Sequence, residues 1–458
     1  MTSTSAYWNR ELETLPWREV EQWQAAQIAS ALPALRQRSG MYADLHAHLP
    51  GDLPIRDLRD LQALPLTLKS DLRAAQDACT AAAPLGRNQA VATDSLVQCI
   101  SSSGTTGQPL YYGLTAADVE RFTDAIANTW FTAGLRSDDV VAHLVGLPMV
   151  AGGLPYADGF RRVGATLCWL GGFPTDRILR EMRRLRVSAL LSTTSFGLYL
   201  AEQWEEVGRQ TGIASALRLV MGGGEPGLNQ PEIRGRIRQG LGIGSLRETM
   251  GLGDVLSSMW SECEAEDGMH FNAQRYVAVE LIDPETGEQK PWAEGATGEL
   301  VYTAFARDAT PVVRYRSRDH ALVTGTRCAC GRTSPRIRCI GRTDDMLIYK
   351  GMNVFPTAIR DLITRHFPGQ VTPSLRLWKT HADQVRFDDP IAVDVEACER
   401  LSAEQSQGLA RAIENEVRAQ LQIRIAVHIL EPGGLPQSAY KNSLIAVRAA
   451  APASSSET

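Results

Sequence analysis

Between about residues 120 and 250, segments with helical periodicity alternate with short apolar segments typical of buried strands. The stretch DRILREMRRLRVSALLSTTS (176–195) predicts a helix followed by a strand, and ALRLVMGGGEPG (216–227) predicts a strand followed by a glycine turn. Parallel strands need a crossover connection, usually a helix, so this alternation predicts an α/β layer with a parallel sheet.

A different pattern begins near residue 275. The stretches RYVAVELIDPETGEQ (275–289) and GATGELVYTAF (295–305) predict strands around a turn-rich segment, which favours antiparallel β structure. Further on, IAVDVEA (391–397), SAEQSQGLARAIENEVRAQL (402–421) and RIAVHIL (424–430) predict a strand, a helix and a strand. These three elements indicate a small α+β unit of roughly a hundred residues.

These patterns suggest a division of the chain. The first stretch, EVEQWQAAQIASALPALRQR (19–38), has helical spacing of its apolar residues, and the last residues are small and polar. We expect one domain over residues 1–343, a second over residues 344–448 and a disordered tail over residues 449–458.

Composition excludes several classes of protein. With 458 residues, of which 44% are hydrophobic, the chain can bury the cores of two domains. A net charge of −5 does not provide the extended basic field of a nucleic-acid-binding protein. No run of 18 apolar residues predicts a membrane span, and we expect the protein in the cytoplasm. Its eight cysteines are then interpreted as thiols or metal ligands rather than disulfides.

The stretch CISSSGTTGQPLYYG (99–113) contains five hydroxyl side chains and two glycines within residues 101–107. Such a run cannot fill a core, because each buried hydroxyl needs a hydrogen-bond partner. It is either an ordinary polar loop or a concave site whose backbone N–H groups and hydroxyls bind phosphate oxygens. It is not a Walker A loop, since Gln108 follows Gly107 where that motif has lysine.

In its surroundings this run resembles the phosphate loop of the adenylate-forming superfamily, in particular that of the phenylacetate–CoA ligase family. Six further stretches are similar to motifs of that family and follow in the same order. They are LPLTLKSDLR (64–73), GGGEP (222–226), ETMGLGD (248–254), VVRYRSRDH (312–320), GRTDDMLIYKGMNVFP (341–356) and GGLPQSAYKNSLI (433–445). The resemblance therefore covers the chain from about residue 64 to residue 445.

The resemblance implies a large adenylation domain, made of layered α/β structure and a β-barrel-like region, joined by a hinge to a small mobile α+β domain. It implies that a carboxylic acid reacts with ATP to give an acyl adenylate and pyrophosphate, and that the acyl group is then transferred to a thiol. Lys441 would bridge the carboxylate and the α-phosphate, although a solvated surface lysine is the alternative. Asp344 would be the pivot of the hinge.

The same resemblance assigns nucleotide-binding residues. Asp319 would accept hydrogen bonds from the ribose hydroxyls, with an ion pair to Arg316 or Arg318 as the alternative interpretation. Arg342 would contact the nucleotide sugar or phosphate. The remaining candidates belong to the phosphate and adenine segments: Ser101, Ser102, Ser103, Gly104, Thr105, Thr106, Gly107, Gly223, Gly224, Glu225, Pro226, Glu248, Thr249, Met250 and Gly251.

At several positions the chain departs from the family pattern. Asp254 stands where the family usually has a glutamate that binds Mg²⁺, and an aspartate is a chemically acceptable but shorter ligand. Met250 replaces the tyrosine that stacks on adenine, and Gly253 replaces a serine or threonine. Gln108 and Tyr440 replace a lysine and a glycine. These losses put nucleotide affinity in doubt and allow a divergent use of the adenylate.

The family places its acyl pocket in a segment that corresponds to HLVGLPMVAGGLPYADGF (143–160). Leu, Val and Met stand there at positions where tyrosines are expected, and Pro148 stands where a glycine is expected. An apolar pocket favours an aryl or arylalkanoic acid without singling out phenylacetate. Core packing is the alternative for most of these residues.

Two stretches predict a metal site. SECEAEDGMH contributes Cys263 and His270, and TRCACGRTSPRIRC contributes Cys328, Cys330 and Cys339. Three thiolates and an imidazole form a closed, tetrahedral, structural Zn²⁺ site. We expect Cys263, His270, Cys328 and Cys330 as ligands, with Cys339 as a possible substitute for Cys263; ordinary thiols and a surface histidine are the alternative. Relatives of the phenylacetate–CoA ligase type often look similar at these positions.

These observations favour an ATP-dependent aryl-acid–CoA ligase that uses ATP, Mg²⁺ and CoA and contains structural zinc. The alternative is an aryl-AMP ligase that passes its activated group to a carrier-protein phosphopantetheine or to another nucleophile. A catalytically silent nucleotide-binding protein is a third interpretation, based on Met250 and Gly253 and opposed by Lys441 and Asp319. We expect no nucleic-acid or membrane partner; a homodimer is typical of related ligases, but no feature of this sequence indicates one.

Overall fold

The computed structural model describes residues 5–51, 53–102, 109–145, 148–224, 227–343, 345–350, 352–381, 384–435 and 444–447. The chain divides into two compact units, one formed by Met1–Gly224 with Ile237–Cys339 and one formed by Glu225–Arg236 with Ile340–Thr458. Each unit has its own hydrophobic core. A chain of this length needs more than one core, because single cores stop growing beyond about 250–300 residues.

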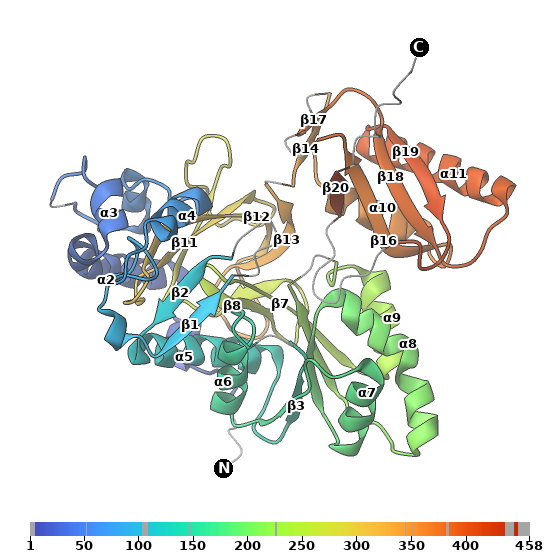
Figure 1. The fold of residues 1–458 in the computed structure, drawn as a ribbon, viewed down its shortest axis with the longest axis horizontal. Helices are drawn as coiled ribbons and strands as arrows, with labels where there is room; N and C mark the ends of the chain where they lie inside the picture. The colour runs from blue at the N-terminus through green and yellow to red at the C-terminus, as the bar shows by residue number, and fades with distance from the viewer. Residues whose placement is uncertain are drawn as a thin grey trace. The chain divides into compact units, whose positions relative to one another are not determined.

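The larger unit is built on one sheet, which has eleven strands among the described residues in the order β10-β11-β12-β13-β9-β8-β7-β6-β5-β3-β4 (Figure 1). One half is parallel, as the strand–helix alternation predicted. Its strands are β3 (Val140–His143), β4 (Thr166–Trp169), β5 (Ala189–Ser192), β6 (Leu219–Gly223) and β7 (Ser245–Leu252). The helices along this part of the chain are α5 (Ala116–Ala133), α6 (Leu154–Val163), α7 (Thr175–Arg184), α8 (Thr194–Thr211) and α9 (Pro231–Leu241).

The other half of the sheet has the antiparallel character expected from residue 275 onward. Its strands are β8 (Leu256–Glu262), β9 (Met269–Phe271), β10 (Ala278–Ile282), β11 (Thr297–Ala304), β12 (Val312–Gly325) and β13 (Arg336–Arg342). The sequence predicted both patterns but not how they are joined. Strand β7 pairs in parallel with β6 and antiparallel with β8, so the two halves form one continuous sheet with a shared core.

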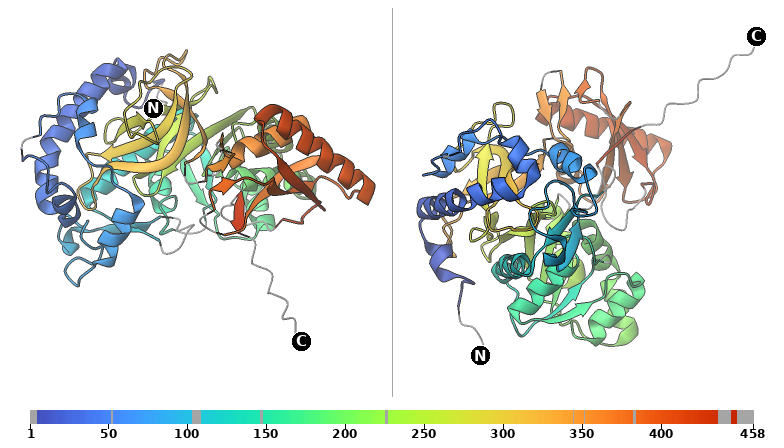
Figure 2. Two further views of the ribbon diagram at one scale, coloured as in Figure 1. Left: turned by 90° about the horizontal axis from the view of Figure 1, so that it is seen from above. Right: turned by 60° about the vertical axis from the view of Figure 1, so that its left-hand side comes forward.

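Helices near the start of the chain cover the antiparallel half. They are α1 (Arg10–Thr14), α2 (Trp17–Arg38), α3 (Gly40–Leu45) and α4 (Lys69–Asp77), with 3₁₀ helices at Leu58–Ala63 and Thr93–Ser95. Helix α2, predicted over residues 19–38, lies beside this half of the sheet (Figure 2), where Gln24 Nε2 donates to the carbonyl oxygens of Gln274 and Val277 at 2.7 and 3.0 Å. Strands β1 (Gln98–Ser101) and β2 (Tyr111–Leu114) form a separate antiparallel pair.

The smaller unit contains the predicted strand–helix–strand. Strand β18 (Ile391–Ala397) is followed by α11 (Ala403–Leu421) and β19 (Ile425–Leu430), and the two strands pair in parallel. Ser402 caps α11 in a capping box with Gln405, which fixes where the helix begins. The unit also contains α10 (Pro356–His366), β14 (Leu347–Tyr349), β15 (Met352–Val354), β16 (Val371–Lys379), β17 (Arg386–Phe387) and β20 (Ile445–Val447). Its strands form a four-stranded sheet and a three-stranded sheet.

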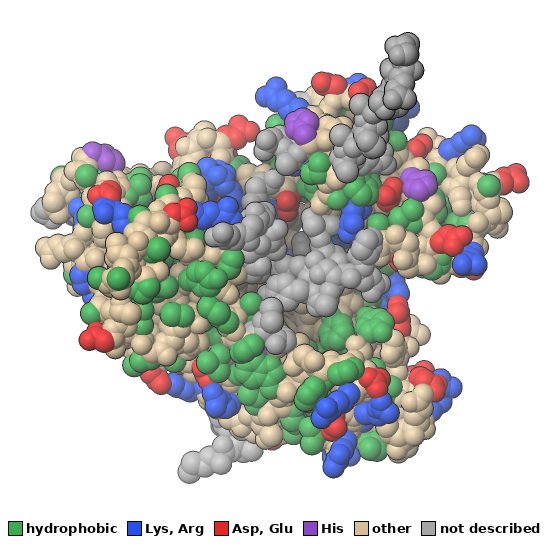
Figure 3. Space-filling view, viewed as in Figure 1, with side chains coloured by type: hydrophobic (Ala, Val, Ile, Leu, Met, Phe, Trp, Pro, Cys, Tyr) green, Lys and Arg blue, Asp and Glu red, His purple; other side chains and the backbone are tan. Residues whose placement is uncertain are grey.

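The surface agrees with the charge balance of the sequence. On the face drawn in Figure 3, basic and acidic side chains of the described residues are interspersed. None of the helices in the described ranges combines the length and the apolar character that crossing a membrane requires.

Candidate functional site

Two of the predicted adenine segments lie side by side at the carboxyl ends of β6 and β7. Gly223 pairs with Thr249 in the parallel register, and Thr249 Oγ1 donates to the Gly222 carbonyl oxygen at 3.1 Å. A Cβ at Gly223 would lie 2.1 Å from the Thr249 carbonyl oxygen, so a side chain cannot be accommodated there. Gly224 follows with a φ of 79°, which favours glycine. In open α/β sheets, ligands bind beyond the carboxyl ends of the parallel strands.

The hairpin of β1 and β2 holds the ends of the hydroxyl–glycine run. The Ser101 N–H donates to the Met149 carbonyl oxygen at 2.9 Å, and the Ala151 N–H donates to the Ser101 carbonyl oxygen at 3.0 Å. The Ser102 hydroxyl accepts a hydrogen bond from the Leu110 N–H at 3.1 Å. These contacts fix the base from which the run extends. Its other predicted residues, Ser103, Gly104, Thr105, Thr106 and Gly107, lie outside the described residues, as does Gln108.

The segment after β6 and β7 explains one departure from the family pattern. A Cβ at Gly253 would lie 3.1 Å from the Ala151 Cβ and 3.5 Å from the Ser102 Cα. The first distance is tighter than ordinary van der Waals contact, so a serine or threonine at residue 253 would push against the Ala151 side chain. Gly251 is more restricted, because its Cβ would lie 2.0 Å from the Ser257 carbonyl oxygen.

The two side chains that precede this segment belong to the sheet. The backbone N–H of Glu248, a buried residue, donates to Glu262 Oε2 at 2.8 Å, which ties β7 to β8. Met250 pairs with Trp260 across these strands and packs against the main hydrophobic core. The expected roles of Glu248 and Met250 toward a nucleotide stay predictions.

The predicted magnesium acid, Asp254, points into the protein. Its Oδ1 accepts a hydrogen bond from the Tyr112 hydroxyl at 2.7 Å, and its Oδ2 accepts from the Tyr315 hydroxyl at 2.9 Å and from Lys69 Nζ at 3.2 Å. We call these four residues the Asp254 network. Burial, with the charge of Asp254, raises the pKa of Tyr112 well above its ordinary value, so its hydroxyl stays a donor. The magnesium role of Asp254 stays a prediction that these contacts do not support.

Asp319, the predicted ribose ligand, is a buried residue of β12 whose backbone N–H donates to the Ser317 hydroxyl at 3.0 Å. Arg316, one of the two partners considered for it, forms a bidentate ion pair with Glu299 at 2.8 and 3.2 Å. The Arg318 backbone N–H contacts the same Glu299 carboxylate at 3.3 Å. The ribose role of Asp319 stays a prediction.

The predicted hinge and catalytic loop are described only in part. Arg342 ends β13, and its carbonyl oxygen accepts a hydrogen bond from the Asp345 N–H at 3.1 Å. Several predicted residues lie outside the described residues: Asp344, Lys441, Glu225 and Pro226, together with Tyr440.

The predicted acyl segment, residues 143–160, contributes largely to an aromatic core. The His143 ring lies 4.7 Å from the Trp169 ring and 5.7 Å from the Phe160 ring between centroids, and Phe160 stacks on Trp130 at 5.1 Å. Burial lowers the pKa of His143 to about 4, so its imidazole is neutral at physiological pH. The Tyr156 hydroxyl donates to the Ser257 carbonyl oxygen at 2.6 Å. Sequence reasoning missed Trp130 and Trp169, because neither lies in the segment.

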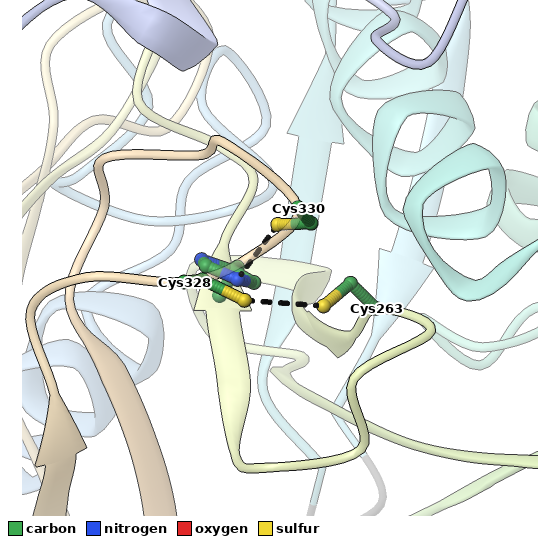
Figure 4. A group of neighbouring side chains, drawn as sticks. Cys263, Cys328 and Cys330 are labelled. Atoms are coloured by element: carbon green, nitrogen blue, oxygen red, sulfur yellow. Dashed lines mark hydrogen bonds between the residues drawn. The ribbon is translucent and has the colours of Figure 1, made fainter.

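The four residues expected to bind zinc come together. Cys263 follows β8, His270 lies in β9, and Cys328 and Cys330 lie in the connection between β12 and β13. Their ligand atoms all lie within 4.8 Å of one another, and they form the single such group of histidine, cysteine and acidic side chains in the described ranges. Figure 4 shows the three cysteines pointing toward one another. We call this group the thiol cluster; Cys339 is not part of it.

Two distances within the thiol cluster match those expected around a tetrahedral metal. The sulfur atoms of Cys263 and Cys328 are 3.6 Å apart, and the Cys330 sulfur lies 3.4 Å from His270 Nε2. Zinc–sulfur and zinc–nitrogen bonds of ordinary length place such atoms roughly 3.5–3.8 Å apart at the corners of a tetrahedron. Ser334 fixes the other imidazole nitrogen, since its hydroxyl and carbonyl oxygens lie 3.2 and 3.3 Å from His270 Nδ1. A hydrogen bond of this kind orients histidine ligands in metal sites.

The protonation of the thiol cluster depends on these contacts. Burial alone would lower the pKa of His270, but hydrogen bonds and charges of the Cys328 and Cys330 thiols outweigh it and raise the pKa. The Cys263 thiol, followed by His270, lowers the pKa of Cys330 well below its ordinary value. At least one thiolate therefore forms readily, and a thiolate is the form that binds metal.

Residues 7–15 contact the connection between β12 and β13, which contains Cys328 and Cys330. The Tyr7 hydroxyl donates to the Cys330 carbonyl oxygen at 3.0 Å, and Arg332 Nε lies 2.8 Å from Glu13 Oε2. Both members of this ion pair are buried. The Thr333 hydroxyl donates to the Leu15 carbonyl oxygen at 2.5 Å. Sequence reasoning missed these contacts, because no motif connects residues 7–15 with residues 330–333.

With this geometry established, comparison with known proteins identifies similar chains. Residues 24–304 match the family described as AMP-binding enzyme, and residues 351–446 match the AMP-binding enzyme C-terminal domain. The chain is 32% identical over 426 residues to the phenylacetate–coenzyme A ligase of Pseudomonas putida, covering 92% of this chain and 90% of that one. It is 30% identical over 446 residues to the enzyme of the same name from Thermus thermophilus, covering 93% and 96%.

A solved structure has a similar fold. The crystal structure of 2-hydroxyisobutyryl-CoA ligase in the postadenylation state, in complex with 2-HIB-AMP, has a TM-score of 0.86 against this chain. The match covers 98% of this chain and 94% of that one at 23% sequence identity. At this identity the likeness supports the fold, in agreement with the large mixed sheet and the small α+β unit.

Proposed function

We propose that this chain, which belongs to the phenylacetate–CoA ligase family of adenylate-forming enzymes and is an AMP-forming acid–CoA ligase, activates an aromatic carboxylic acid. The reaction converts the acid and ATP into an acyl adenylate and pyrophosphate and then transfers the acyl group to CoA. The observation that carries the choice of an aryl or arylalkanoic acid is the likeness to phenylacetate–coenzyme A ligases over more than nine tenths of the chain.

The chemistry explains the kind of site that the sequence predicts. A carboxylate that attacks an α-phosphate brings two anions together, so catalysis depends on neutralising charge and aligning the reactants. We infer that Lys441 supplies the positive charge and that the hydroxyl–glycine run of residues 101–107 donates hydrogen bonds to the phosphates. Asp319 would hold the ribose hydroxyls, and the glycines beyond β6 would lie against the adenine. Mg²⁺ would be held mainly by the substrate phosphates.

The two half-reactions need different arrangements of the catalytic groups. We infer that the domain over residues 344–448 moves about Asp344, so that the lysine loop leaves and CoA gains access. Proline at this position would restrict the backbone rotation that a pivot requires. Asp344→Pro should therefore preserve adenylation and abolish thioester formation. Equal loss of both half-reactions would contradict a pivot at this residue.

Pyrophosphate release across a panel of aryl and aliphatic acids, with and without CoA, tests the substrate class. We expect aryl or arylalkanoic acids to give the fastest release, and CoA to be consumed stoichiometrically with the acid. Lys441→Ala should reduce release by at least about a hundredfold while the variant stays folded. Preference for aliphatic acids would contradict the proposed substrate. Product formed only with a carrier-protein thiol or an amine would favour the alternative acceptor, which the departures at Met250 and Gly253 allow.

We also infer that Cys263, His270, Cys328 and Cys330 bind one structural Zn²⁺. Four ligands leave no open coordination position, which is characteristic of structural rather than catalytic zinc. The mutual approach of the four ligand atoms, within 4.8 Å, supports this assignment. Metal analysis of protein purified under reducing conditions should find one zinc per chain, and its absence would refute the site.

A further inference from the structure

We propose that Asp254 is a positioning residue that holds the phosphate, adenine and ribose segments of the nucleotide site together, rather than a ligand of Mg²⁺. The proposal rests on the proposed function, because it concerns the same nucleotide site. It begins with the Asp254 carboxylate, whose side chain is 3% exposed and accepts three hydrogen bonds from the protein.

Each donor belongs to a different segment of the predicted site. Tyr112 lies in β2, five residues after the end of the hydroxyl–glycine run, and pairs with Ile100 on the other strand of the hairpin. Tyr315 lies in β12, four residues before Asp319. Lys69 begins α4, within the stretch LPLTLKSDLR. Asp254 itself follows the glycines of residues 251–253, so one carboxylate connects four segments that are distant in the sequence.

A buried arginine, Arg307, also contacts Asp254 and Tyr112. Arg307 Nη1 donates to the carbonyl oxygens of Asp254 and Val255 at 3.0 and 3.2 Å, and Nη2 donates to the Thr310 hydroxyl at 2.9 Å. Its guanidinium carbon lies 4.7 Å from the centre of the Tyr112 ring. The backbone and the side chain of Asp254 are therefore both fixed, and so is the ring that donates to it.

The charge of the carboxylate is already compensated. Lys69 Nζ lies 3.2 Å from Oδ2, and the two tyrosine hydroxyls supply neutral donors. To bind Mg²⁺ directly, this carboxylate would have to give up at least one of these hydrogen bonds and turn toward solvent. An aspartate is one methylene shorter than the glutamate usual in the family, and its oxygens reach the tyrosines instead.

Loss of the Asp254 carboxylate should weaken the attachment of the four segments to one another rather than remove a metal ligand. Asp254→Asn keeps the size of the side chain but replaces one acceptor oxygen by a donor, which cannot accept from Tyr112 or Tyr315. Tyr112→Phe removes one donor and leaves the carboxylate in place. Both changes should weaken nucleotide binding, because the base of the hydroxyl–glycine run and the ribose strand lose their common attachment.

Binding of AMP in magnesium-free buffer, measured by calorimetry, tests the proposal without the reaction. We expect Asp254→Asn to raise the AMP dissociation constant about tenfold and Tyr112→Phe to raise it about fivefold. Tyr276→Phe is a matched control, since its hydroxyl donates to the Asp124 carboxylate at 2.8 Å outside these segments, and it should leave AMP binding unchanged. Asp254→Glu should also weaken AMP binding, because the longer side chain overpacks the site.

The magnesium dependence of the rate separates the two roles. A positioning residue predicts that Asp254→Asn raises KM for ATP while the Mg²⁺ concentration for half-maximal rate stays the same. Unchanged AMP binding in Asp254→Asn and Tyr112→Phe, together with a several-fold higher Mg²⁺ requirement in Asp254→Asn alone, would overturn the proposal in favour of a magnesium ligand. Failure of the unmodified protein to bind AMP would overturn the proposed function itself, and the inference with it.

Discussion

Two groups of polar side chains in the larger unit differ in how the protein satisfies them. In the Asp254 network, a carboxylate accepts hydrogen bonds at 2.7, 2.9 and 3.2 Å from side chains of three other segments. In the thiol cluster, four potential ligands approach one another at distances such as 3.4 and 3.6 Å, and their contacts are mainly weak ones that involve sulfur. The network contains its own counter-charge in Lys69, whereas the cluster gathers thiols around one imidazole.

This difference indicates which group needs a ligand. A buried polar group whose hydrogen bonds are satisfied by the protein is stable by itself, and a ligand would have to displace those bonds. A group of soft donors at tetrahedral spacing gains most of its stability from an ion. We therefore assign the metal to the thiol cluster and an organising role to the Asp254 network.

Removal of a thiolate should have the largest effect. Cys330→Ser should abolish stoichiometric zinc and lower the free energy of unfolding by about 3 kcal/mol or more, because the metal is lost with its ligand. Chemical unfolding and metal analysis measure the two effects. Cys79→Ser, at an exposed cysteine, is the control and should change neither. Full stability of Cys330→Ser without zinc would show that the cluster, like the Asp254 network, is complete without an ion.

High pH should act on the Asp254 network with a smaller effect. The pKa of Tyr112 is raised in the folded state, so the unfolded chain loses the phenolic proton first. The stability that this group contributes is fully present below pH 10 and is lost as the pH rises above 10. Tyr112→Phe should flatten this fall by up to roughly 1.4 kcal/mol per pH unit. Urea unfolding between pH 9 and 11 measures the slope, and an unchanged slope would contradict a buried hydroxyl.

We expect the smallest effect on stability at the contact between Tyr7 and the connection that contains Cys330. Tyr7→Phe removes the hydrogen bond to the Cys330 carbonyl oxygen, and we expect it to cost about 0.5 kcal/mol while zinc is retained. Limited proteolysis should cleave residues 5–15 faster in this variant than in the unmodified protein. Loss of zinc in Tyr7→Phe would show that the segment is needed to build the site, which would sharpen the contrast with the self-contained network.

Much of the fold follows from local sequence patterns. The alternation over residues 120–250 predicted the parallel half of the sheet, and residues 391–430 predicted the strand–helix–strand of the smaller unit. These elements are predictable because periodicity reports which side of a helix or strand is buried. The grouping of the four members of the thiol cluster was predicted as well, since cysteines and a histidine in two short stretches form a pattern typical of metal ligands.

The features that could not be predicted depend on contacts between residues that are far apart in the sequence. Tyr112 and Asp254 are 142 positions apart, and nothing in either stretch indicates that a hydroxyl of one would meet a carboxylate of the other. A family motif suggested a magnesium ligand at residue 254, and it gave no indication that the Asp254 carboxylate accepts hydrogen bonds from Tyr112 and Tyr315. The aromatic packing of His143 with Trp169 could not be predicted for the same reason, because the local sequence around one residue does not indicate its packing partner.

The contact between Tyr7 and Cys330 has a consequence for biosynthesis. The two residues are 323 positions apart, so a ribosome that adds about 5–20 residues per second makes the first roughly 15–65 seconds before the second. The Tyr7 hydroxyl therefore waits through the synthesis of these intervening residues for the Cys330 carbonyl oxygen. Other contacts of the same segment, such as Trp8 Nε1 with Asp124 Oδ1 at 3.0 Å, can form earlier, so the segment docks in steps as the chain lengthens.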